Sequence, residues 1–97
     1  MDIQKEIKDA TLVANLIGNI DSTTAGDLEV LKDELTDIQS LVLDFTEVGY
    51  ISSKGIRVIL MLNKLMQGKG GMKITNANNA VREVFRLSGL LPLITLE

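Results

Sequence analysis

The chain contains neither cysteine nor histidine. Their absence excludes cysteine nucleophiles, Ser–His catalytic triads and nearly every kind of zinc site. It also excludes disulfide bonds, which fits a reducing compartment, and we therefore expect a cytoplasmic protein. Aromatic residues make up only 3% of the chain, so aliphatic side chains must form most of the core. Nucleotide-binding motifs are missing too: Gly68–Gly71 is glycine-rich but lacks phosphate-loop spacing, and we interpret it as a turn.

Basic clusters and long apolar runs are also missing. The net charge is −3 and Lys and Arg are scattered among acidic residues, whereas nucleic-acid binding generally requires a basic surface. The longest apolar run is Val58–Leu62, far short of the roughly 20 residues of a membrane-spanning helix. The first residues show no signal-peptide pattern. We therefore expect no nucleic-acid partner and no direct membrane insertion.

The residues that are present are those of an ordinary globular protein. The 97 residues are 45% apolar and 24% charged, proportions that are typical of a folded domain. This length suits one domain with one modest core. We see neither an internal repeat nor a linker, and we expect residues 1–97 to form a single domain.

Strands are predicted at regular intervals along the sequence. Short aliphatic runs indicate strands at Thr11–Ile20, Ser40–Phe45 and Gly71–Asn76. Aliphatic residues occupy both alternating registers of Thr11–Ile20, which predicts a strand covered on both faces. Ile3–Asp9 predicts a weaker edge strand, paired back through a turn near Lys8–Ala10.

Helices are predicted between these strands. Apolar residues spaced by three and four predict helices within Asp21–Ile38, Gly55–Gln67 and Ala80–Gly89. At the start of the first helix, Thr24 with Asp27 resembles a capping box.

The C-terminal third of the sequence carries clear boundary signals. Asn78 or Asn79 can cap the last helix, and Gly89 stands where a left-handed residue would end it. Pro92 places the closing segment Leu91–Leu96 at an edge or terminal position of a sheet.

This order of elements predicts an α/β fold. Strands separated by helices pair in parallel through right-handed crossovers. In such sheets, functional sites gather on the loops that follow the carboxyl ends of the strands. The three predicted strand-to-helix loops share polar side chains, namely Asn19, Asp21, Ser22, Thr23, Thr24, Ser52, Ser53, Lys54, Asn76, Asn78 and Asn79.

The polar loops offer little catalytic chemistry. Ser53 and Lys54 are the one nucleophile–base pair that the composition permits, but neighbours on a helix point away from each other. Arg57 has the right spacing from Ser53 but stays protonated. Asp21 and Asp44 are the only acids near strand ends, too few for metal-dependent hydrolysis. We expect no enzymatic activity, no metal and no cofactor.

Two adjacent serines lie between the third predicted strand and its helix, in GYISSKGIRVIL (Gly49–Leu60). Serine is a preferred N-cap because its hydroxyl accepts a hydrogen bond from a free backbone N–H, a bond worth about 1 kcal/mol. Capping accounts for one serine only. It leaves Gly55 unexplained, since glycine in the first turn weakens a helix. Either this glycine lets a partner approach closely, or it relieves crowding inside the domain.

Three segments resemble the STAS domain of bacterial anti-sigma factor antagonists. They are GNIDSTTAGDL (Gly18–Leu28), LVLDFTEVGYISSKGIRVIL (Leu41–Leu60) and NANNAVREVFRLSGLLPLI (Asn76–Ile94). The resemblance spans nearly the whole chain, and the middle segment is the specific one. It implies a single STAS domain, an α/β fold with a mixed, mostly parallel sheet of four to five strands and helices packed against it.

The resemblance also implies a serine phosphoswitch. In such antagonists the unphosphorylated protein binds an anti-sigma factor serine kinase and so frees a sigma factor. The kinase switches the antagonist off by phosphorylating it, and a metal-dependent serine phosphatase resets it. By position Ser53 is the implied phosphoacceptor, with Ser52 as the second candidate. Ser52 stands where the family often has Asp, itself a good N-cap, so Ser52 is the better candidate for the cap of the helix. Lys54 departs from the family, which usually has Ser, Thr or Ala there, and it puts a cation beside the acceptor.

The same resemblance implies the residues that contact partners. They are Asp21, Ser22, Thr23, Ser52, Lys54, Gly55 and Arg57. The alternative function is that of a non-phosphorylated STAS subunit or scaffold in a transporter or another signalling complex.

Overall fold

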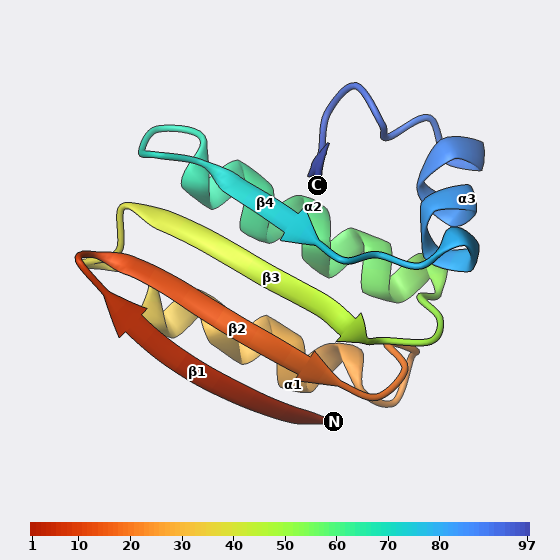
Figure 1. Ribbon diagram of the computed structural model, residues 1–97, viewed down its shortest axis with the longest axis horizontal. Helices are drawn as coiled ribbons and strands as arrows, with labels where there is room; N and C mark the ends of the chain where they lie inside the picture. Colours follow the sequence, from red (N-terminus) through yellow and green to blue (C-terminus); the bar gives the residue numbers. More distant parts are fainter.

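A computed structural model describes residues 1–97, in which one five-stranded sheet is packed against helices. The elements follow one another as β1 (Asp2–Lys8), β2 (Thr11–Ile17), α1 (Ala25–Glu29), the 3₁₀ helix η1 (Val30–Glu34), β3 (Ser40–Glu47), α2 (Ser53–Met66), β4 (Met72–Thr75), α3 (Asn79–Leu87) and β5 (Thr95–Leu96) (Figure 1).

The strands lie side by side in their order along the chain, from β1 to β5. β1 is antiparallel to β2, and the other pairs are parallel. Asp9 and Ala10 form the β1–β2 turn with φ angles of 53° and 70°, the left-handed pair that suits a two-residue hairpin. The predictions of a mixed, mostly parallel α/β sheet and of an antiparallel edge strand are confirmed.

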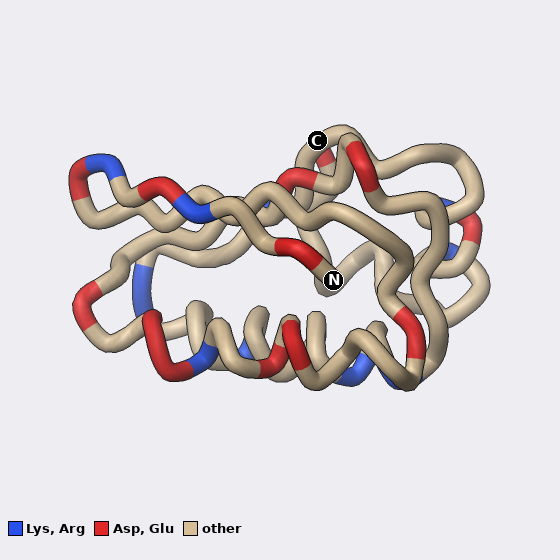
Figure 2. The backbone as a smooth tube through the Cα atoms, turned by 90° about the horizontal axis from the view of Figure 1, so that it is seen from below, with Lys and Arg blue, Asp and Glu red and all other residues tan.

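Helices cover only one face of the sheet. In Figure 2 the sheet is seen along its edge, and the long helical coils run along one side of it. β2 alternates between half-buried and buried side chains, the buried ones being Leu12, Ala14 and Leu16. The prediction of two covered faces for Thr11–Ile20 is therefore wrong. Val13 and Ile17 lie on the open face, where they are half-buried, and their aliphatic character made both registers resemble core positions.

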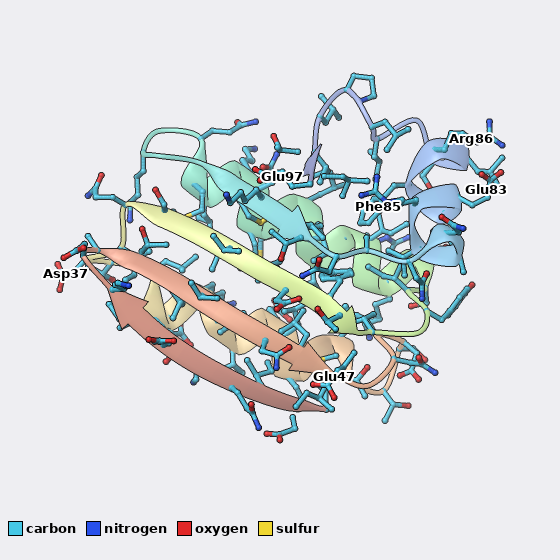
Figure 3. All side chains as sticks on the ribbon, viewed as in Figure 1. Asp37, Glu47, Glu83, Phe85, Arg86 and Glu97 are labelled. Atoms are coloured by element: carbon cyan, nitrogen blue, oxygen red, sulfur yellow. The ribbon has the colours of Figure 1, made fainter.

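One apolar core fills the space between the sheet and the helices. It contains 26 buried residues, and no polar or charged side chain is buried. Phe45 in β3 and Phe85 in α3 are its largest fully buried side chains. Phe85 lies on the side of α3 that faces the rest of the domain, whereas Glu83 and Arg86 point outward (Figure 3). Because these are the only two phenylalanines, aliphatic side chains make up the rest of the core.

The helix predicted within Asp21–Ile38 is shorter and is divided in two. α1 ends at Glu29, and the chain continues as the 3₁₀ helix η1. The apolar residues whose spacing predicted this helix are nevertheless buried, namely Leu28, Leu31, Leu35 and Ile38. In a 3₁₀ helix residues three apart eclipse each other. Leu31 in η1 is buried like Leu28 in α1, so the buried face continues through the change of helix type.

The other predicted boundaries agree with the structure. α2 ends shortly before Gly68, Asn78 rather than Asn79 caps α3, and Gly89 adopts a φ of 73°. The closing strand has only two residues, follows Pro92 and lies at the edge of the sheet. None of the helices combines the length and the apolar character needed to cross a membrane.

Gly55 permits a close approach between α2 and the loops after β2 and β3. A Cβ at this position would lie 2.6 Å from Cγ2 of Ile20 and 2.8 Å from Cγ1 of Ile51. Both isoleucines are fully buried, so neither can move aside freely. We expect Gly55→Ala to lower the free energy of unfolding by about 1–3 kcal/mol, the usual effect of overpacking a core. Chemical denaturation measures this change.

Gly26→Ala is the matched control, because Gly26 lies in α1 and an added Cβ would meet nothing within 4 Å. Alanine there should leave stability unchanged or raise it by up to about 1 kcal/mol. If Gly55→Ala were as stable as the parent protein, the crowding around Gly55 would not be real.

Candidate functional site

The loops after β2 and β3 are joined by backbone hydrogen bonds. The N–H of Ile20 donates to the carbonyl of Tyr50 at 2.9 Å, and the N–H of Ser52 donates to the carbonyl of Ile20 at 2.8 Å. Ile20 and Ile51 thereby form a short parallel bridge beyond the strand ends. Both side chains are fully buried. The start of α2 is thus fixed both to the core and to the loop that carries Asp21.

Asn78 joins the third loop to the second. Its Nδ2 donates to the carbonyls of Val48 at 3.2 Å and Gly49 at 3.3 Å, while its Oδ1 accepts from the N–H of Val81 at 2.8 Å. One side chain therefore caps α3 and holds the loop that leads into α2. The three polar loops lie together at one end of the sheet, as predicted (Figure 1).

Asp21 is held in a compact turn. Its Oδ1 accepts from the N–H of Thr24 at 3.0 Å and of Thr23 at 2.8 Å, and the N–H of Asp21 donates to Oγ1 of Thr24 at 2.9 Å. This reciprocal pair is a capping box. The predicted box of Thr24 with Asp27 is wrong because the Thr24 side chain is bonded back to Asp21. The backbone N–H groups of Thr24 and Thr23 lower the pKa of the Asp21 carboxyl, since they favour its charged form.

Asp44 is also engaged within the domain. Its Oδ1 accepts from the hydroxyl of Thr46 at 2.6 Å, the N–H of Thr46 at 3.0 Å and Nδ2 of Asn76 at 3.1 Å. The Thr46 hydroxyl is the main cause of the lowered pKa of Asp44. This carboxylate therefore connects β3 to the loop after β4. No three acidic side chains lie close enough together to hold a metal ion.

The two adjacent serines have different structural positions. Ser52 is extended, with φ −92° and ψ 173°, and its Oγ accepts from the N–H of Gly55 at 3.3 Å. The prediction that Ser52 is the N-cap of α2 is confirmed. Ser53 is the first residue of α2 and is exposed, and no hydrogen bond within the domain holds its hydroxyl. The Ser53 hydroxyl is therefore accessible to another molecule.

Gly55 has an internal explanation. Its Cα faces Ile20 and Ile51, and the missing Cβ would also lie 3.1 Å from the Ile20 carbonyl oxygen. Of the two explanations open from the sequence, the relief of crowding is the correct one. Gly55 is buried, so it offers little surface to a partner.

The other expected contact residues lie on the two loops that the Ile20–Ile51 bridge joins and at the start of α2. Asp21 and Ser52 are half-buried, and the exposed members are Ser22, Thr23, Lys54 and Arg57. The ion pairs of the domain involve neither Lys54 nor Arg57. Both cations are thus free to meet an acidic or phosphorylated group. We call these four exposed residues, together with Ser53 and Tyr50, the Ser53 surface.

Tyr50 is the member that sequence reasoning missed. It is the only tyrosine in the chain, and its side chain is 50% exposed next to the start of α2. Tyrosine combines a large apolar ring with a polar hydroxyl and is enriched in protein interfaces. The signal was present in the sequence, since a lone aromatic two residues before Ser52 stands out in an aromatic-poor chain.

Comparisons with known proteins agree with this architecture. The family model of the STAS domain matches residues 2–97. BtrV of Bordetella bronchiseptica, which is named as an anti-sigma factor antagonist, is 38% identical over 88 residues, which cover 88% of this chain and 76% of BtrV. The crystal structure of an anti-sigma factor antagonist from Mycobacterium paratuberculosis has a TM-score of 0.87 at 25% identity, covering 98% of this chain and 83% of that one.

The anti-sigma factor antagonist SpoIIAA shares the fold. Its unphosphorylated form has a TM-score of 0.82 at 21% identity, covering 99% of this chain and 88% of that one. The phosphorylated form of the Bacillus protein has a TM-score of 0.68 at 20% identity, covering 99% and 91% of the two chains.

Ser52→Ala tests the N-cap. We expect it to lower the free energy of unfolding by about 1 kcal/mol, because the N–H of Gly55 loses its acceptor. Ser53→Ala is the matched control, since it removes a neighbouring hydroxyl that caps nothing. Urea denaturation of both variants measures the difference, and equal stabilities would show that the Ser52 hydroxyl does not stabilise the helix.

Asp21 should contribute to the acid sensitivity of the fold. A carboxyl whose folded pKa lies below its ordinary value of 3.8 stabilises the folded state above that value. This stabilisation is lost as the pH falls through the folded pKa. Asp21→Asn retains an acceptor oxygen but cannot titrate, so its stability should fall less between about pH 5 and pH 2.

Stability curves against pH measure this effect. Asp37→Asn, which removes an exposed carboxyl that makes no hydrogen bond, controls for the loss of one charge. If the free energy of unfolding of Asp21→Asn fell with decreasing pH as steeply as that of the parent protein, the expectation would be contradicted.

Proposed function

The chain belongs to the STAS domain family, and from this membership we propose that it is an anti-sigma factor antagonist. It acts by binding rather than by catalysis, within the cytoplasm and as a single domain. Its partner is an anti-sigma factor that is also a serine kinase. The unphosphorylated antagonist occupies this kinase, so that a sigma factor is released.

Sequence relatives support this proposal. BtrV, which carries the name of an antagonist, matches most of the chain at an identity well above that of the fold neighbours. The Mycobacterium protein with the same description shares nearly the whole fold. The carboxylates Asp21 and Asp44 are engaged in hydrogen bonds within the domain, which supports a structural role for both.

The free hydroxyl of Ser53 is the observation that carries the regulatory part of the proposal. Ser52 is used as the cap, whereas Ser53 is exposed at the start of α2. A kinase can reach the Ser53 Oγ without first breaking a bond in the domain. We propose Ser53 as the phosphoacceptor, with a metal-dependent serine phosphatase as the enzyme that restores the hydroxyl.

A phosphate on Ser53 suits the start of the helix. It would add about −1.5 to −2 charges, and the free N–H groups and dipole of a helix N-terminus favour negative charge. Arg57 lies one turn further along the helix, on the same side as Ser53, and Lys54 is adjacent. Phosphorylation should therefore leave α2 intact and change only the shape and charge of the Ser53 surface. The switch acts on the partner and not on the antagonist's own fold.

Substitution of Ser53 tests this mechanism. With a candidate anti-sigma factor kinase from the same organism, Ser53→Ala should bind regardless of ATP, and Ser53→Asp should bind at least tenfold more weakly. Isothermal titration calorimetry measures the affinities, and mass spectrometry locates the phosphate. Ser52→Ala is the control and should still be phosphorylated. Equal phosphorylation of Ser53→Ala and the parent protein would exclude Ser53 as the acceptor.

NMR of the phosphorylated protein tests the surface mechanism separately. The amide signals of α2 should keep their helical pattern, with changes confined to residues around Ser53. Loss of helical signals along α2 would contradict a switch that acts only at the surface.

A further inference from the structure

The outer edge of β1 is unoccupied. β1 is the first strand of the sheet and pairs only with β2, and no element lies beyond it in Figure 1. All seven of its residues are exposed except Ile3, which is half-buried, and the Ile7 side chain is 65% exposed. A long edge strand with free N–H and C=O groups is a ready template for pairing with another strand.

We propose that β1 pairs antiparallel with β1 of a second copy of this chain. A two-fold axis perpendicular to the sheet then joins two sheets into one continuous sheet, with the helices of both copies on the same side. Such an isologous contact requires the strand to be complementary to itself in the reversed direction. The sequence DIQKEIK meets this requirement in one register.

That register is centred on Lys5. It places Asp2 opposite Lys8 and Ile3 opposite Ile7, and by symmetry each of these pairs occurs twice. Directly opposed side chains in antiparallel strands interact, and opposite charges or paired β-branched residues are the favourable cases. Ile3 and Ile7 also lie on the same face of β1, because their partners in β2, Leu16 and Leu12, are both buried.

The neighbouring symmetric registers are less favourable. If the two β1 strands are shifted so that Gln4 lies opposite Gln4, Asp2 lies opposite Glu6 in two places. If the strands are shifted so that Glu6 lies opposite Glu6, two like charges meet at the centre. Asp2 then extends beyond the end of the other strand and has no residue of that strand opposite it. Like charges in direct opposition are destabilising. Charge therefore selects the register in which all seven residues are paired.

In this register the two copies of Lys5 lie opposite each other at the centre and are the only like-charged pair. Within each domain, Glu34 already neutralises the charge of Lys5. Nζ of Lys5 lies 2.9 Å and 3.0 Å from the two carboxylate oxygens of Glu34. Each copy would bring its own Glu34, so the centre of the contact holds two lysines and two glutamates. The net charge at that point is neutral.

The proposed contact leaves the Ser53 surface open. Ser53 begins α2, which follows β3 along the chain, and β2 lies between β1 and β3 in the sheet (Figure 1). The dimer would therefore present two Ser53 surfaces at once. The pairing does not depend on phosphorylation or on the identity of the anti-sigma factor, so it can be tested with the purified chain alone.

A charge-swap experiment tests the pairing and its register. Sedimentation equilibrium at physiological ionic strength, where repulsion between like-charged copies is screened beyond about 8 Å, should show a monomer–dimer equilibrium for the parent chain. Asp2→Lys and Lys8→Asp should each weaken dimerisation about tenfold, because each sets like charges opposite one another twice. The double variant D2K/K8D restores opposite charges and should recover the parent affinity.

Asp33→Lys is the matched control, since it makes the same change of charge at an exposed position of η1, and it should dimerise like the parent chain. Circular dichroism and urea denaturation check that each variant is folded. The proposal fails if the parent chain stays monomeric at millimolar concentration. It also fails if the single variants dimerise normally, or if the double variant does not recover.

Discussion

The functional end of this protein depends on the short backbone bridge between Ile20 and Ile51. This bridge joins the loops that follow β2 and β3, and it continues into the N–H of Ser52, which donates to the Ile20 carbonyl. The polar backbone groups are satisfied by one another, while both isoleucine side chains are fully buried in the core. The loops are therefore fixed from two directions.

On this segment, one serine hydroxyl stabilises the helix and the neighbouring serine hydroxyl is exposed to solvent. Ser52 is turned inward as the helix cap, and Ser53 is turned outward without a bond. One carboxylate oxygen of Asp21 likewise accepts the hydrogen bonds that form the turn before α1. The polar groups that hold the loops are thus distinct from the exposed groups that a partner can touch. A charge added to one of the exposed groups would therefore leave the hydrogen bonds that maintain the loops in place.

The sequence was sufficient for the order of elements, the antiparallel edge strand, and the caps at Ser52 and Gly89, because each depends on local chemistry. It left Asn78 and Asn79 as alternative caps of α3. It was insufficient where three-dimensional context decides. Val13 and Ile17 resemble core residues by composition, yet they lie on the face that no helix covers. The capping box forms between Asp21 and Thr24 and not at the predicted pair, because the path of the incoming chain determines which N–H groups are free. The role of Gly55 was ambiguous for the same reason, since only the packed structure shows what a side chain there would meet.

Close packing at Gly55 also limits how this region can change in evolution. A side chain at position 55 and the branched side chains at Ile20 and Ile51 compete for the same volume. Substitutions of residues in contact are not independent in their effect on stability. A smaller residue at Ile20 or Ile51 would open space beside position 55, and a side chain at 55 would then cost less stability. Substitutions at these three positions are therefore expected to be coupled in their effect on stability, which ties the loop after β2 to the segment from Ile51 to Gly55.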